Sequence, residues 1–193
     1  MGAVIVDDLP PEELLFHWKG GRVCLDFVAT VGERWRRSFE RLRSPEDLAR
    51  WLVESGMLHD APRIPVPQLE AGRTLREAIN RLARPGVAAE AGDRAELNRW
   101  ALRPPLAPQL TGDGGVVWVS DCLVEAALAT IARDAIDLLT GPLAGRIREC
   151  AAADCALLFV DRSRPGQRRW CAGDRCGNRT RTKAYRQRRR ERG

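Results

Sequence analysis

The sequence lacks long apolar runs. No stretch reaches the ~18–20 consecutive apolar residues that a membrane-spanning helix needs, which excludes a spanning protein. Residues 1–15 have no basic segment ahead of an apolar one, so we expect no secretory signal and a cytoplasmic location. Hydrophobic residues still make up 44% of the 193 residues, enough for one ordinary core with a small appendage.

The residues and motifs that carry catalysis are scarce as well. The chain has two histidines, His17 and His59, and we expect both in loops. No Ser, His or Cys set has the spacing of a nucleophile and its base, and neither a G-x-G-x-x-G segment nor a P-loop occurs. We therefore expect that the protein is not an enzyme.

Lysine is almost absent: 32 side chains are Lys or Arg, and only Lys19 and Lys183 are lysines. The position of the charge is more informative than this ratio. Residues 146–193 hold 15 basic and five acidic side chains, a net +10, whereas residues 1–145 are net −4. The sequence thus predicts an acidic body, 1–145, and a basic module, 146–193. Such asymmetry is typical of a protein that binds a polyanion, nucleic acid before membrane.

The body has the periodicity of an α+β domain that is mostly helical, with a small antiparallel sheet. The expected helices are one that begins at Ser44 and ends at Gly56, one over 66–83, one that begins at Asp93 in a capping box and ends before Pro104, and one over 121–140. Residues 109–110 and 116–119 predict a hairpin. Residues 22–31 alternate at first and could begin as a strand, although their type is ambiguous.

Tryptophans, cysteines and one aspartate of the body raise the question of a ligand site. We interpret five tryptophans as core residues: Trp18, Trp35, Trp51, Trp100 and Trp118. Cys24 and Cys122 fit buried thiols. Asp26 is flanked by apolar residues, and the favoured interpretation is a hydrogen bond to nearby backbone. The alternative is a pocket for a small-molecule effector around Asp26 and Trp118.

The other four cysteines form two close pairs. Cys150 and Cys155 are followed, after fifteen residues, by Cys171 and Cys176. Two such pairs can supply four thiolates to a tetrahedral metal, and zinc suits four soft ligands, with iron as the alternative. A disulfide interpretation requires an oxidising compartment that nothing here predicts. We expect one structural zinc per chain, whose binding is coupled to folding of the module.

The module is expected to end in a basic helix over 180–192, after a short strand over 157–160. Arg179, Lys183, Arg186 and Arg190 share one face of that helix. The candidate nucleic-acid contacts are Arg168, Arg169, Arg179, Arg181, Lys183, Arg186, Arg188, Arg189 and Arg190. Double-stranded DNA is the expected partner and RNA the alternative. A homodimer is also compatible with the sequence.

These residues resemble the CGNR zinc-finger proteins. The matching segments are Cys150…Cys155-Ala-Leu-Leu-Phe-Val-Asp-Arg-Ser163 and Arg168-Arg-Trp-Cys171…Cys176-Gly-Asn-Arg179. The body is similar, more loosely, to the ABATE domain through residues 24–30, 44–56, 75–78 and 97–98, although the family usually has Asn-Thr where this chain has Ala29-Thr30.

The resemblance implies a stress-linked bacterial transcription regulator whose body senses or dimerises and whose finger binds DNA. We therefore expect an α+β body followed by a treble-clef-like four-cysteine module that ends in a basic helix. An RNA- or ribosome-binding zinc protein, or a small-molecule sensor with an accessory finger, is the alternative.

Overall fold

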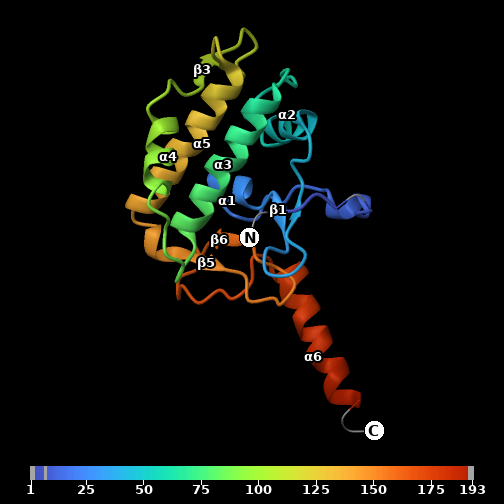
Figure 1. Ribbon diagram of the computed structural model, residues 1–193. Coiled ribbons are helices and arrows are strands. Elements are labelled where there is room, and N and C mark those ends of the chain that lie inside the picture. The colour runs from blue at the N-terminus through green and yellow to red at the C-terminus, as the bar shows by residue number, and fades with distance from the viewer. Residues whose placement is uncertain (1–2, 7, 191–193) are drawn as a thin grey trace.

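The computed structural model describes residues 3–6 and 8–190. Its α-helices are α1 (Val23–Val28), α2 (Pro45–Glu54), α3 (Val66–Ala83), α4 (Asp93–Ala101), α5 (Leu123–Thr140) and α6 (Asn178–Arg190). Two short 3-10 helices, η1 (Pro11–Glu13) and η2 (Ala144–Arg146), and one π-helix, η3 (Gly173–Gly177), complete the helical elements of the described residues. Its strands are β1 (Val31–Gly32), β2 (Phe39–Glu40), β3 (Ala107–Leu110), β4 (Val116–Val119), β5 (Ile147–Glu149) and β6 (Leu158–Val160). They form three two-stranded antiparallel sheets. Helices α3, α4 and α5 stand side by side (Figure 1). Helix α6 projects from the end of the molecule that lies opposite β3.

Local sequence signals account for most helix boundaries. The Ser44 hydroxyl accepts a hydrogen bond from the Asp47 amide, and the Asp47 carboxylate accepts one from the Ser44 amide, so α2 begins in a capping box. Helix α4 begins at Asp93 as expected, but the capping box predicted there is wrong. The Asp93 carboxylate instead accepts from the Glu90 amide and pairs with Arg81 at 2.6 Å, because α3 packs against α4.

The predicted hairpin is confirmed, whereas the suggested strand after Arg22 is wrong. Strands β3 and β4 pair from Ala107 with Val119 to Leu110 with Val116. Residues 23–28 instead form α1, which packs between α3 and α5. Four of its six residues are buried. Burial on so many sides removes the polar stripe that identifies an exposed helix.

The core contains two of the five tryptophans. Trp51 and Trp100 are 0% and 2% exposed. The core interpretation of the other three is wrong, since Trp18, Trp35 and Trp118 are 39%, 64% and 39% exposed. Among the thiols, Cys24 is buried as expected, whereas Cys122 is exposed. Cys122 lies at the start of α5, before the helix enters the core.

The same core continues into the basic module. Ile147, Leu158 and Val160 join the cluster formed by α1 to α5. The Val160 amide donates to the Gly20 carbonyl at 2.9 Å. Phe159 points to the other face of β6, into a second cluster that contains the cysteines. The module is therefore docked on the body, although the boundary after Gly145 stays a prediction.

None of the helices in the described part of the chain combines the length and apolar character needed to cross a bilayer.

Candidate metal centre and basic helix

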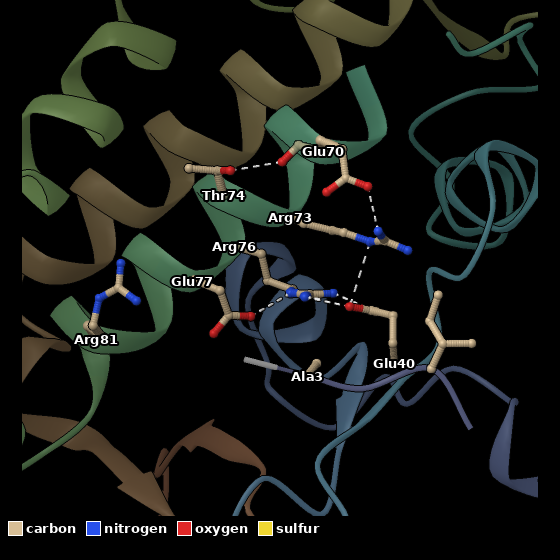
Figure 2. Close-up of a pocket in the computed structure, with 9 residues that line it drawn as sticks. Ala3, Glu40, Glu70, Arg73, Thr74, Arg76, Glu77 and Arg81 are labelled. Carbon is tan, nitrogen blue, oxygen red and sulfur yellow. Dashed lines mark hydrogen bonds and ion pairs between the residues drawn. The ribbon is translucent and has the colours of Figure 1, made fainter. Parts of the chain in front are cut away.

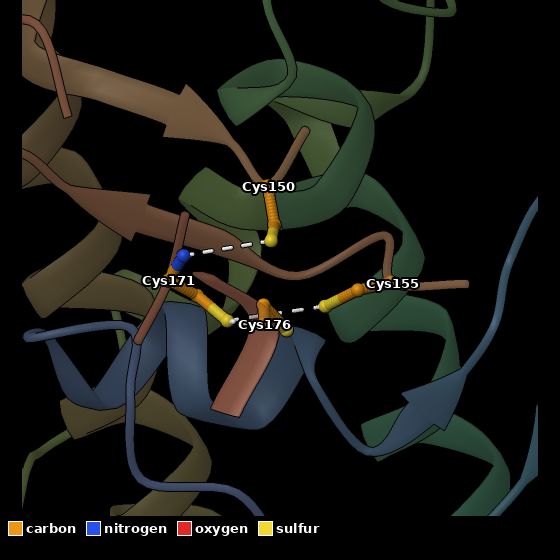
Figure 3. A group of neighbouring side chains, drawn as sticks. All are labelled: Cys150, Cys155, Cys171 and Cys176. Carbon is orange, nitrogen blue, oxygen red and sulfur yellow. Dashed lines mark hydrogen bonds between the residues drawn. The ribbon is translucent and has the colours of Figure 1, made fainter. Parts of the chain in front are cut away.

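Four thiols converge where the turns of the basic module meet. Cys150 follows β5 and Cys155 precedes β6, while Cys171 and Cys176 come from the segment that leads through η3 into α6. Their four Sγ atoms all lie within 4.8 Å of one another. Figure 3 shows the side chains pointing toward a common centre. Cys150, Cys171 and Cys176 are buried, and Cys155 is partly buried.

The geometry of the thiols fits a tetrahedral metal. Zn–S bonds of about 2.3 Å place ligand sulfurs roughly 3.8 Å apart at the corners of a tetrahedron. The Sγ of Cys171 lies 3.9 Å from that of Cys155 and 3.6 Å from that of Cys176. The Cys171 amide donates to Cys150 Sγ at 3.5 Å, and Arg179 donates to Cys176 Sγ at 3.6 Å. Both N–H groups can donate in the same way to a thiolate that binds a metal.

The thiols of Cys150, Cys155 and Cys171 share their protons. Hydrogen bonds from the thiols of Cys155 and Cys171 lower the pKa of Cys150. The same contacts raise the pKa of Cys155 to about 12 and that of Cys171 further, since each donates its proton to a neighbour. A divalent metal would replace those shared protons and hold all four groups as thiolates.

A buried aspartate shapes the loop between the cysteine pairs. Asp161, which is 0% exposed, accepts hydrogen bonds from the Ser163 hydroxyl at 2.7 Å and from the amides of Ser163 and Arg168 at 2.9 and 2.8 Å. The Ser163 hydroxyl first, and then the two amides, lower its pKa to about 2. The carboxylate therefore fixes the turn that returns the chain to Cys171.

Helix α6 carries seven basic and no acidic residues over Asn178–Arg190. Its first turn is tied to the module, because Asp154 pairs with Arg179 at 2.7 Å and with Lys183 at 3.5 Å. Arg181 donates to the Asn178 side chain at 2.5 Å. The remaining basic residues, which pair with none of the described carboxylates, are Arg186, Arg188, Arg189 and Arg190. The helix begins two residues before the expected Thr180, and positions 191–192 lie outside the described residues.

The two arginines before Cys171 differ in their contacts. The Arg168 guanidinium donates to the carbonyls of Trp170 and Cys171 and lies 4.8 Å from the Phe159 ring centre. These contacts give Arg168 a role in holding the loop. Arg169 is exposed and lies 5.2 Å from the Trp170 ring centre.

The two body residues considered for an effector pocket lie on different elements, Asp26 on α1 and Trp118 on β4. Asp26 accepts from the Gly20 amide at 2.8 Å and lies close enough to Asp134 to feel its charge. Trp118 precedes the start of α5 at Leu123. The contact of Asp26 with backbone matches the favoured interpretation, and an effector pocket around Asp26 and Trp118 stays a prediction.

A charged cavity of about 390 Å³ borders α3, but its side chains neutralise one another. Arg76, 2% exposed, makes a two-point contact with Glu40 at 2.7 Å and also pairs with Glu77 (Figure 2). Arg73 pairs with Glu70, and Arg81 pairs with Asp93. This paired set holds β2 against α3 and leaves no cation free for a ligand among the groups that Figure 2 labels.

Two contacts that join body and module have no signal in the sequence. Arg84, at the end of α3, reaches Glu149 on β5, and His17 contacts both Arg41 and Arg175. His17 and Arg175 are 158 positions apart, so no local spacing could indicate the contact.

Comparison with known families matches both parts of the chain. Residues 21–142 match the ABATE family, described as "Putative stress-induced transcription regulator", and residues 146–189 match the CGNR zinc finger. No curated protein matched in the comparison. One family is of a regulator type and the other of a zinc-finger type, and neither is an enzyme family. The finger, with its four clustered cysteines, holds one structural zinc. The chain belongs to the ABATE family and carries a C-terminal CGNR zinc finger.

Proposed function

We propose that the protein is a zinc-dependent transcription regulator that binds double-stranded DNA through α6. The observation that carries the proposal is the projecting helix with four arginines that pair with no described carboxylate (Figure 1). Repulsion among these charges is relieved when phosphates replace solvent beside them, and counterions are released. Arginine also reads guanine in the major groove through two hydrogen bonds.

Zinc has a positioning role in this proposal. The ligands are Cys150, Cys155, Cys171 and Cys176, and four thiolates leave no place for a reactive water. Cys176 lies in η3, directly before α6, and its carbonyl accepts from the Thr180 hydroxyl at 2.8 Å. The metal would thus fix the first turn of the helix, and the Arg179–Asp154 pair would hold its direction.

Duplex DNA is favoured over single-stranded nucleic acid by the side chains of α6. Tyr185 is the one aromatic residue of the helix and is 57% exposed. Single-strand binding typically relies on several stacked aromatic rings. The contact set we propose contains Arg181, Arg186, Arg188, Arg189 and Arg190, with Arg169 as a second contact. The set leaves out three candidates whose described contacts lie within the module: Arg168, Arg179 and Lys183.

The test is the salt dependence of DNA binding by the zinc-loaded full chain. About five phosphate contacts predict a slope of log K against log salt of about −4 to −5. The double variant R186Q/R190Q should flatten the slope by about 2. The matched control is R63Q/R94Q, which removes the same charge from exposed positions of the body.

Three outcomes would contradict the proposal. They are a salt-independent affinity, no duplex binding at micromolar protein, or equal slopes for the α6 and control variants. Structured RNA that displaces labelled duplex at lower concentration than unlabelled duplex would make RNA the partner instead.

A further inference from the structure

A second cavity, of about 570 Å³, lies between the body and the zinc module. The body contributes residues from η1 to β2, including His17, Ala29 and Arg41, and the module contributes Cys155 and Arg175 among others. This volume is within the range of sites that hold small metabolites. Ala29, at the end of α1, is among the residues that line this cavity.

Arg41 brings a buried positive charge to the cavity wall. It is 4% exposed and donates to the carbonyls of Glu13 and Ala29 at 2.7 and 3.0 Å and to His17 at 3.3 Å. A guanidinium has five N–H groups, so two remain without a partner among the described residues. None of the described carboxylates forms an ion pair with it. Burial first, and then the charge of Arg175, lower the pKa of Arg41 to about 10.

Arg175 brings a second cation close to the first. Its Nη1 lies 2.9 Å from His17 Nε2, the atom that Arg41 also approaches. Burial and the two arginines lower the pKa of His17 to about 3, which keeps the imidazole neutral. Two guanidinium groups thus converge on one neutral ring, and neither pairs with a described carboxylate.

Three of the acidic side chains that line this cavity already pair with arginines. Glu13 and Glu33 pair with Arg37 at 2.8 and 2.9 Å, and Asp154 pairs with Arg179 at 2.7 Å. One buried acceptor remains, because Glu13 Oε2 has no hydrogen-bond partner. A ligand that suits both features has an anionic end for the arginines and a donor group for Glu13.

We propose that this cavity binds a small organic anion, whose carboxylate or phosphate group lies beside His17 and accepts hydrogen bonds from Arg41 and Arg175. The inference does not depend on DNA binding, since neither arginine belongs to the contact set of α6. Because the walls come from both parts of the chain, the bound anion links the body to the segment that leads into α6. Such a ligand stabilises the docked arrangement by binding only to it.

The probes are inorganic phosphate and malonate, titrated into the zinc-loaded full chain by calorimetry, with chloride holding the ionic strength constant. The two anions separate phosphate from carboxylate recognition. We expect at least one to bind and to raise the melting temperature above that in chloride alone. Arg175→Gln, an exposed position that folding should tolerate, should weaken binding at least tenfold. Elemental analysis should confirm that this variant keeps its zinc.

Two variants with similar charge changes serve as controls. Arg94→Gln, on an exposed face of α4, should bind the anion as the parent protein does. R186Q/R190Q should also keep anion binding even where it loses DNA, which separates this proposal from the previous one. The proposal is overturned if neither anion binds beyond the chloride baseline, if R175Q matches R94Q, or if R186Q/R190Q abolishes the binding.

Discussion

The guanidinium of Arg84 lies 2.6 Å from Glu149 Oε1 and joins the end of α3 to β5. Arg84 is 3% exposed, and it also donates to the Ala156 carbonyl at 3.2 Å and to the Asn80 side chain. The Trp35 ring lies over it at 4.5 Å, and the Trp35 indole donates to the same Glu149 carboxylate. One buried side chain thus contacts two segments of the zinc module and the loop between β1 and β2.

Replacement of Arg84 should lower the free energy of unfolding more than replacement of an exposed arginine does. Arg84→Ala removes the ion pair with Glu149 and leaves the Ala156 carbonyl without its donor, so we expect a loss of about 2–4 kcal/mol. Urea denaturation measures it. Arg94→Ala, on an exposed position of α4, is the control and should change stability by less than about 0.5 kcal/mol. Equal midpoints for the two variants would contradict the role of Arg84.

Loss of zinc should weaken the body as well as the finger. Leu158 and Val160 belong to the body's core, while the turns on either side of β6 depend on the cysteine cluster. Cys176→Ser should therefore abolish stoichiometric zinc and lower the unfolding midpoint reported by the buried Trp51 and Trp100. Cys122→Ser, which alters an exposed thiol outside the cluster, should keep both the zinc and the midpoint. An unchanged midpoint in zinc-free C176S would show that the body folds independently of the finger.

Asp26 should give the protein a stability that depends on pH. Burial raises the pKa of this carboxyl from 3.8 to about 6. The folded state therefore binds the proton more tightly than the unfolded state, and the resulting stabilisation, complete below about pH 4, is lost as the pH rises through 6. Asp26→Asn removes the charge and keeps an oxygen for the Gly20 amide. We expect the variant to be about 1–2 kcal/mol more stable at pH 7.5 and equal to the parent at pH 4.

Urea denaturation at the two pH values measures this difference. The control is Asp60→Asn, whose parent side chain is 94% exposed, and it should change stability by less than about 0.5 kcal/mol at both. A D26N advantage that is the same at pH 4 and pH 7.5 would contradict the buried charge as its cause.

Local signals predicted those parts of the fold that local interactions determine. Helix α3 has the expected bounds, Val66–Ala83, because prolines mark both ends, and the cysteine spacing identified the metal cluster. Helix α1 was missed because burial on several sides hides its period. Trp35 was misplaced because Arg84 and Glu149 hold it at the module interface instead of in the core. The cavity of Arg41 and Arg175 was unpredictable, since only docking of the finger on the body brings the two together.

The buried pair of Glu40 and Arg76 should be the most sensitive charged contact of the body. Both side chains are almost fully buried, at 3% and 2% exposure, and two bonds of 2.7 Å join them (Figure 2). Glu40→Gln leaves a buried guanidinium with only Glu77 as its acid partner, so we expect a loss of about 3–5 kcal/mol. Glu70→Gln is the matched control in the same cavity, because the 57% exposed Glu70 side chain pairs with Arg73 at the surface and should contribute less than about 1 kcal/mol. Thermal and urea unfolding of both variants would check the difference, and a similar small loss for each would mean that water already solvates Arg76.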